Sequence, residues 1–228
     1  MKMKRSEKLG MFTGLVVGVL LLLISVFMIF QTTCKVWGAE KPANATQQGI
    51  DVSSHQGKID WEQVKNSALA DYAIIRCGYG VNQTDKDDKY WDYNSSECER
   101  LGIPYGTYLY SGADTTAKAK SEAEHVVRLL QGKNLTYPIY YDMEADMLNQ
   151  LSSTQIGNIA KTFLNTMESY GYKNVAVYSN KYLFETKLTA SVFSDYPKWI
   201  AQHSNKCTYQ GSYHMWQYET QGVITGIS

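Results

Sequence analysis

The sequence has no net charge, because its 228 residues carry 22 lysines and arginines against 22 aspartates and glutamates. A chain without excess positive charge lacks the field that gathers nucleic acid through its phosphates, so no nucleic-acid partner is expected. Its four histidines, at positions 55, 125, 203 and 214, form no pair one helical turn apart, and no cysteine has metal-ligand spacing. We therefore expect neither a metal nor a cofactor.

Cysteine is scarce as well, and only Cys77, Cys98 and Cys207 follow residue 48. Disulfides are permitted outside the cell, but three cysteines cannot all pair within one chain. Cys77 ends an expected strand and Cys98 lies on the helix after it, so these two could form a bridge. Buried free thiols are the favoured alternative.

Charge is also absent from residues 11–30, a run of twenty residues interrupted only by two glycines, a threonine and a serine. About twenty apolar residues span a bilayer as a helix. The four lysines and arginines within residues 1–10 precede this run, and the positive-inside rule places such a basic tail in the cytoplasm. We expect a single-pass membrane anchor with the rest of the chain outside the cell. The alternative is a signal peptide cleaved near residues 36–39, followed by secretion.

The residues after the apolar run divide into a tether and one folded domain. Residues 31–48 are small and polar, as in a short linker, and the domain begins at residue 49. Short β-branched and aromatic runs then alternate with helical patterns, an order typical of a parallel sheet with crossover helices. The expected strands are 50–52, 73–77, 106–110, 138–142, 175–178, 197–201 and 214–218, and the expected helices are 60–67, 91–100, 117–130, 154–170 and 181–187.

A parallel sheet of this kind is either open and doubly wound or closed into a barrel. No Gly-x-Gly-x-x-Gly follows the first strand, whereas chemically useful side chains recur at or just past the C-terminal ends of the strands. A barrel gathers those ends around one mouth. We therefore expect a small, incomplete TIM-like β/α barrel, with a mouth that contains Asp51, Arg76, Tyr108, Tyr110, Asp142, Glu144, Tyr178, His203 and Gln217.

The sharpest local signal is the pair Asp142 and Glu144 at the end of the fourth expected strand. Residues i and i+2 of a strand point to one face, so the two carboxyl groups project together, with Met143 on the other side. Two adjacent carboxylates raise the pKa of one of them, which can then hold a proton near neutral pH and act as an acid. A solvated strand end or a cation site is the simpler interpretation. Asp51, expected at the same mouth, favours catalysis.

Seven short motifs, in order along residues 49–228, together resemble glycoside hydrolase family 25, the N-acetylmuramidases or lysozymes of the fungal and phage type. Each motif is weak alone, and their ordered combination is far more specific. They are GIDVSSHQG at 49–57, IIRCGYG at 74–80, GTYLYS at 106–111, YDME at 141–144, VYSN at 177–180, WIA at 199–201 and MWQY at 215–218.

The resemblance implies an enzyme that cuts the β-1,4 bond between N-acetylmuramic acid and N-acetylglucosamine in peptidoglycan, and we expect it to be a monomer. Glu144 matches the family's general acid, and Asp142 matches the residue that assists attack by the substrate's own N-acetyl group. Direct attack by water with inversion is the rival mechanism. Asp51 matches a further acid that positions substrate or supports Asp142. The resemblance implies that the sugar-binding residues are Arg76, Tyr108, Tyr110, Tyr178, Trp199, Trp216 and Gln217.

Two departures from the family pattern matter for function. Members usually continue beyond the MWQY motif to a last strand with another active-site aspartate, whereas this chain stops at Ser228. We expect a fragment of a longer product, and the alternative is a weak or inactive protein that binds peptidoglycan as a scaffold. The second departure is His203, which stands where a tyrosine is common and is expected to tune the groove.

Overall fold

A computed structural model of the chain describes residues 41–227. The expected basic tail and membrane span, residues 1–30, lie outside this range, as does most of the expected tether. None of the helices between residues 41 and 227 combines the length and the hydrophobicity that a bilayer crossing needs.

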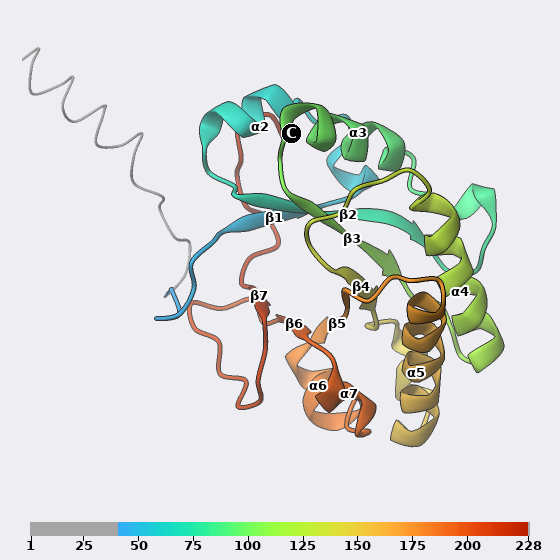
Figure 1. The fold of residues 1–228 in the computed structure, drawn as a ribbon. Helices are drawn as coiled ribbons and strands as arrows, with labels where there is room; N and C mark the ends of the chain where they lie inside the picture. Colours follow the sequence, from blue (N-terminus) through green and yellow to red (C-terminus); the bar gives the residue numbers. More distant parts are fainter. Residues whose placement is uncertain (1–40, 228) are drawn as a thin grey trace, which may run out of the picture. The chain divides into compact units, whose positions relative to one another are not determined.

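The fold is built on a curled sheet of seven strands in which every neighbouring pair is parallel (Figure 1). The strands lie side by side in chain order, as the alternation of strands and helices requires. All seven expected strands are present within two residues of their expected bounds. They are β1 Gly49–Val52, β2 Tyr72–Tyr79, β3 Tyr105–Tyr110, β4 Ile139–Asp142, β5 Val175–Asn180, β6 Lys198–Ala201 and β7 Met215–Gln217.

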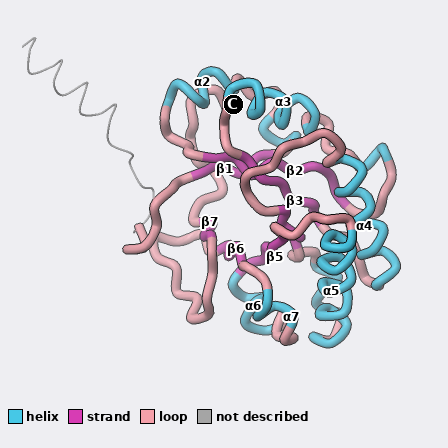
Figure 2. The backbone as a smooth tube through the Cα atoms, viewed as in Figure 1, coloured by secondary structure: helices cyan, strands magenta, loops and turns pink. Residues whose placement is uncertain are grey.

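Helices connect the strands and cover the outer face of the sheet (Figure 2). The five expected helices are present within one residue of their expected bounds, and the short helix α7 was not expected. The bounds are α2 Trp61–Ser67, α3 Trp91–Leu101, α4 Thr116–Leu129, α5 Ser153–Ser169, α6 Lys181–Thr186 and α7 Val192–Asp195, with short 3₁₀ turns at Ser54–Gln56, Thr84–Lys86 and Asp146–Gln150.

Local signals explain where the longest helix begins and ends. Ser152 and Gln155 form the expected capping box at the start of α5, since each side chain bonds to the other's backbone N–H. The helix ends at Ser169, and Gly171 then adopts a φ of 92°, which a residue without Cβ tolerates. The expected closing role of Gly171 is therefore confirmed.

Alternation along the strands divides the core into two layers. Inward-facing side chains form a small cluster inside the curled sheet, made of Ile74, Tyr140, Ala176, Tyr178, Trp199 and Ala201. The neighbouring residues, such as Tyr141 and Ile200, point outward into the larger core between sheet and helices. This inner cluster fills the space that the curled sheet encloses. The polar side chains that could act on a substrate therefore lie at the ends of the strands.

The sheet stays open between its edge strands β1 and β7, whose backbones are not paired in the described part of the chain. Side chains bridge the opening instead: Gln217 Nε2 donates to Asp51 Oδ1 at 3.0 Å, and Gln48 Nε2 donates to the Tyr218 hydroxyl at 2.5 Å. The segment after β7 then reaches α2, where the Asp60 N–H donates to the Gly226 carbonyl. The barrel is thus a half-barrel, as the sequence predicts.

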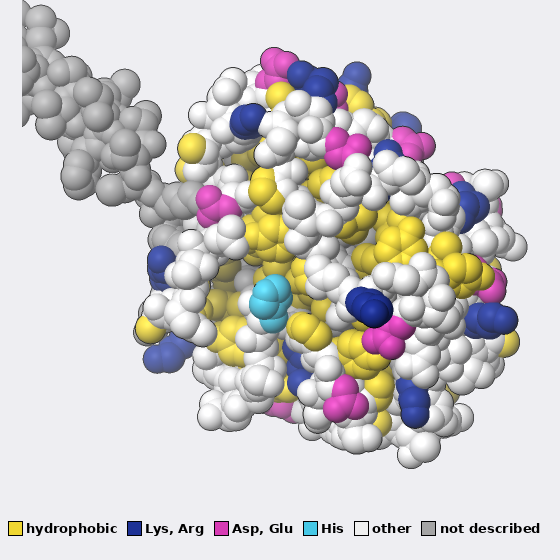
Figure 3. All heavy atoms as spheres, in the orientation of Figure 1, with side chains coloured by type: hydrophobic (Ala, Val, Ile, Leu, Met, Phe, Trp, Pro, Cys, Tyr) yellow, Lys and Arg dark blue, Asp and Glu magenta, His cyan; other side chains and the backbone are white. Residues whose placement is uncertain are grey.

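All three cysteines of the described domain are free thiols, so the Cys77–Cys98 bridge is not formed. Cys77 and Cys98 are fully buried, and burial raises the pKa of Cys77 to about 12. On the surface shown in Figure 3, basic and acidic side chains are interspersed, in places side by side, in keeping with the balanced composition.

Candidate active site

The C-terminal ends of the strands surround a pocket of about 250 Å³. Three carboxyl groups expected from the sequence line this pocket together, contributed by β1 and by the end of β4. Its lining residues are Asp51, Tyr108, Asp142, Glu144, Tyr178, Trp199, His203, Gln217 and Thr220. The structure therefore brings together seven of the ten expected catalytic and binding residues.

Strand register explains why side chains distant in sequence meet here. Asp142 lies opposite Tyr110 of β3 on one side and Tyr178 of β5 on the other. Glu144 follows two residues later and lines the same pocket, whereas Met143 between them is buried in the outer core. The alternation that predicts a shared face for Asp142 and Glu144 is thus present at the end of β4.

Asp142 is the most constrained of the three acids, since only 3% of its surface is exposed. Burial raises the pKa of its carboxyl group well above the usual range, and the neighbouring Glu144 and Asp51 raise it further. Within residues 41–227, Asp142 Oδ1 is one of three buried side-chain polar atoms without a hydrogen-bond partner. A buried acceptor without a donor is costly, so this oxygen is suited to receive an N–H or O–H from a ligand.

Glu144 and Asp51 also hold their protons more tightly than free carboxyl groups do. Burial raises the pKa of Glu144, against the opposing effects of His203 and Tyr178. Burial likewise raises the pKa of Asp51, against a hydrogen bond from Gln217. One pocket therefore contains three acids whose pKa values are all shifted upward, which is the arrangement that proton transfer near neutral pH requires.

Gln217 on β7 connects the two open edges of the half-barrel inside this pocket. Its Nε2 donates to Asp51 Oδ1 at 3.0 Å, and its Oε1 accepts from the Tyr178 hydroxyl at 2.9 Å. The same Oε1 lies 3.0 Å from His203 Nε2. Sequence reasoning placed Gln217 among the sugar-binding residues but did not predict that it links β1, β5 and the loop after β6.

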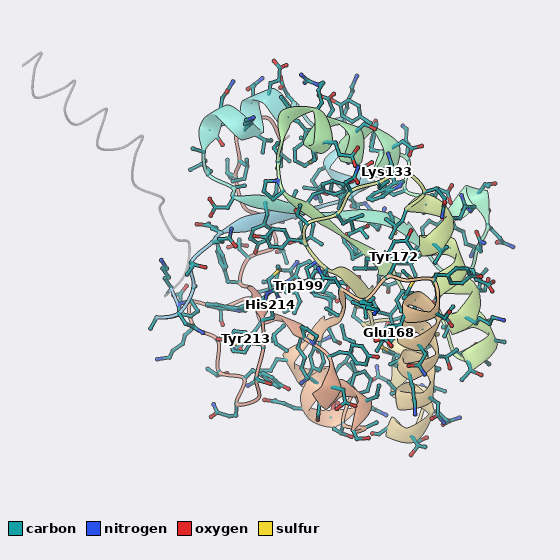
Figure 4. The ribbon with its side chains drawn as sticks, viewed as in Figure 1. Lys133, Glu168, Tyr172, Trp199, Tyr213 and His214 are labelled. Atoms are coloured by element: carbon teal, nitrogen blue, oxygen red, sulfur yellow. The ribbon has the colours of Figure 1, made fainter. Side chains whose placement is uncertain are left out.

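Aromatic rings form the floor and one wall of the pocket. Trp199 lies within the space that the strands enclose (Figure 4), with its ring centroid 4.4 Å from that of Tyr178 and 5.0 Å from that of Tyr140. Tyr108 meets Trp199 edge to face at 6.3 Å. Tyr108, Tyr178 and Trp199 line the pocket, so they can contact a sugar ring there.

Three expected binding residues lie outside the pocket lining. Arg76 on β2 is held away from it by an ion pair of 2.8 Å with the buried Asp88 and by a hydrogen bond to Ser54. Tyr110 ends β3, beside Asp142 in the register, and the pKa of its hydroxyl is raised by burial and by the nearby carboxylates. Trp216 lines a separate pocket between β1 and β7, where its Nε1 donates to the Gln202 carbonyl at 2.9 Å.

A buried glutamate on α4, which was not predicted, contacts β4 from the outer side of the sheet. Glu122 is fully buried and accepts hydrogen bonds from the Ser111 and Tyr141 hydroxyls and from the Gly112 N–H. The Ser111 N–H in turn donates to the Asp142 carbonyl at 2.9 Å. Nothing in the local sequence marks Glu122, because its partners come from β4 and from the segment just after β3, which only the fold brings together beside α4.

Comparisons with known proteins agree with this site. The chain is 29% identical to the autolytic lysozyme of Clostridium acetobutylicum over 182 residues, which are 79% of this chain and 53% of that protein. Among solved structures, the modular autolysin LytC of Streptococcus pneumoniae aligns with a TM-score of 0.72 at 34% identity, covering 79% of this chain and 44% of that one. The chain thus spans about half the length of each.

A family 25 glycosyl hydrolase from Bacillus anthracis has the same fold, with a TM-score of 0.71 at 21% identity over 82% of this chain and 86% of that one. The family model described as Glycosyl hydrolases family 25 matches residues 50–227, from β1 to the segment after β7. Apart from Gly49, the seven motifs, the half-barrel and the carboxyl pocket all fall within this match. The chain belongs to glycosyl hydrolase family 25.

Proposed function

We propose that this protein is a peptidoglycan hydrolase of the N-acetylmuramidase type, which cleaves the β-1,4 bond between N-acetylmuramic acid and N-acetylglucosamine. The observation that carries the proposal is the pocket in which Asp51, Asp142 and Glu144 meet with raised pKa values. A structural cluster of three acids would be expected to pair with cations, whereas Asp142 Oδ1 has no partner within the described domain.

Glu144 is the proposed general acid. Its raised pKa lets the carboxyl group keep a proton at the pH where the reaction occurs, and it is only half-buried, so a substrate can reach it. The proton passes from Glu144 to the leaving glycosidic oxygen as the bond between that oxygen and the anomeric carbon breaks. Glu144 is then a carboxylate and can take a proton from the water that completes hydrolysis.

Asp142 is proposed to assist the substrate's own N-acetyl group. Its unpartnered Oδ1 can accept the acetamido N–H, which makes the acetamido oxygen a better nucleophile toward the anomeric carbon. A bond from that oxygen to the anomeric carbon forms as the glycosidic bond breaks, and water later opens the resulting ring. Asp51, held by Gln217, is proposed to position the sugar beside Asp142.

The substrate class is inferred from relatives as well as from the pocket. The Clostridium relative is named an autolytic lysozyme, and LytC has also been solved in complex with a synthetic peptidoglycan ligand, in a structure that aligns with a TM-score of 0.71 at 33% identity. Tyr108, Tyr178 and Trp199 supply the aromatic faces that pyranose rings contact.

The proposal is tested by incubating the purified protein with purified peptidoglycan and analysing the products by mass spectrometry. We expect soluble fragments that end in reducing N-acetylmuramic acid. The configuration of the new reducing end distinguishes the two mechanisms, because assistance by the N-acetyl group retains it and direct attack by water inverts it. Fragments that end in reducing N-acetylglucosamine would contradict muramidase action, and binding without release would favour a scaffold.

We propose further that residues 11–30 anchor the protein in the cell membrane, with residues 49–228 as a catalytic domain outside the cell. The uncharged run and the basic residues before it support this topology. We expect the intact chain in the membrane fraction, resistant to extraction at high salt and high pH, with the domain degraded when intact wall-free cells are treated with protease. Recovery of the domain in the medium, without residues 1–39, would instead indicate a cleaved signal peptide.

A further inference from the structure

His203 lines the carboxyl pocket but has no part in the mechanism proposed above. It lies two residues beyond the end of β6, and its Nε2 is 3.0 Å from Gln217 Oε1. Its side chain is exposed, so the imidazole can exchange protons with solvent. Of the nine residues that line the pocket, His203 is the one whose side chain can carry a positive charge.

The orientation of the Gln217 amide determines what His203 does in this contact. The Gln217 NH₂ group must face Asp51, because a carbonyl oxygen turned toward that carboxylate would repel it. Gln217 Oε1 therefore faces both the Tyr178 hydroxyl and His203 Nε2. Since a carbonyl oxygen only accepts hydrogen bonds, His203 Nε2 must carry a hydrogen, either as the neutral Nε2–H tautomer or as the imidazolium.

The positive charge of protonated His203 acts on Glu144 and Asp51. Its cationic form favours the carboxylate forms of Glu144 and Asp51 and so lowers the pKa of both, against the larger raising effect of burial. Arg76, the cation that acts on Asp142, is ion-paired with the buried Asp88. The proton balance of Glu144 and Asp51 therefore depends on the state of a solvent-exposed imidazole.

We propose that His203 is a positioning residue of the carboxyl pocket, whose Nε2–H holds the Gln217 amide against Asp51 and whose positive charge, when protonated, acts on Glu144 across the pocket. This inference rests on the proposed function, because it takes Glu144 as the acid. His203 thereby couples the loop after β6 to the two acids at the open seam between β1 and β7.

Several titratable groups surround His203 and enter its pH dependence. Those that face it across the pocket are Asp51 from β1, Asp142 and Glu144 from the end of β4, and Tyr178 from β5. On its own loop the charged neighbour is Lys206. After β7, Glu219 accepts hydrogen bonds from the Thr220 and Gln221 N–H groups.

The test compares two substitutions that separate the hydrogen bond from the charge. His203→Phe removes both, whereas His203→Gln removes the charge but places an amide N–H where Nε2 was. We expect His203→Phe to lower kcat on soluble peptidoglycan fragments about tenfold, with a smaller change in KM, and His203→Gln to stay within about threefold of wild type at its optimum. His214→Gln is the matched control, since His214 lies just before β7, at the other end of that strand from Gln217, and does not line the carboxyl pocket.

The pH profile provides the second readout. In both His203 variants the alkaline limb of kcat should move to higher pH, because loss of the imidazolium raises the pKa of Glu144 and the acid must be protonated to act. A limb that does not move in His203→Phe overturns the role of charge. Equal losses of kcat in the two variants overturn the role of the hydrogen bond.

A measurement without turnover separates this inference from the proposed function. Long-range ¹H–¹⁵N NMR of the unliganded protein at high pH should show neutral His203 as the Nε2–H tautomer, whereas the Nδ1–H tautomer would overturn the proposed contact. If wild-type protein releases no reducing ends, the proposed function fails together with the effect on Glu144. The tautomer still decides whether His203 holds Gln217.

Discussion

Glu144→Gln should reduce the release of reducing ends from peptidoglycan by about a thousandfold, the effect expected when a general acid is removed. The substitution keeps the size of the side chain and its half-buried place in the pocket but provides no acidic proton. Departure of a sugar alkoxide without that proton is slow, so kcat should fall while KM changes little. Steady-state kinetics with soluble peptidoglycan fragments measure both constants.

A control variant and a control substrate test whether the effect of Glu144→Gln comes from the loss of an acidic proton. Asp146→Asn removes one negative charge from an exposed residue just after the site, and its kcat should stay near wild type. With a nitrophenyl glycoside of N-acetylmuramic acid, whose leaving group departs without a proton, Glu144→Gln should lose much less activity than with peptidoglycan. Equal losses on the two substrates would mean that Glu144 is not the acid.

Asp142→Asn should lower kcat about a hundredfold and yet make the folded protein more stable at neutral pH. The loss of activity follows from the proposed contact of Asp142 with the acetamido group, since an amide at this position holds that group less strongly than a carboxylate. The gain in stability follows from burial, because folding places an ionisable carboxyl group among two others at 3% exposure. We expect the free energy of unfolding to rise by roughly 1 kcal/mol.

The stability difference has a defined pH dependence. The pKa of Asp142 is higher in the folded than in the unfolded chain, mainly through burial. Below the pKa that Asp142 has in the unfolded chain, its carboxyl group is protonated in both the folded and the unfolded state, and no charge is buried on folding. At such pH this group should therefore cause no difference between the free energies of unfolding of wild type and Asp142→Asn. As the pH rises through the unfolded pKa toward the folded pKa, wild type loses stability that Asp142→Asn keeps.

Urea unfolding between pH 3 and pH 8 measures this dependence, with Asp146→Asn as the control for simple loss of one negative charge. Asp146 is exposed, so its substitution should give no comparable gain. On the nitrophenyl glycoside, Asp142→Asn should lose as much activity as on peptidoglycan, because assistance by the acetamido group does not depend on the leaving group. A less stable Asp142→Asn protein at pH 7 would show that the carboxylate is favourably solvated in the free enzyme.

The sequence by itself determined the helices and strands and which three acids are candidates for the site. Short β-branched and aromatic runs between helical patterns located every strand of the sheet, and the Ser152 capping box marked the start of α5, because these signals depend only on neighbouring residues. The spacing of Asp142 and Glu144 was also sufficient to place both on one face, since alternation along a strand is a local property.

Only the tertiary structure decided how the site is connected. Gln217 joins Asp51 to Tyr178 because the curl of the sheet brings β1, β5 and β7 together across 166 positions of sequence. The ion pair with Asp88 holds Arg76 outside the lining of the carboxyl pocket. Such contacts depend on register and curvature summed over the whole sheet, and no local pattern of residues encodes either one.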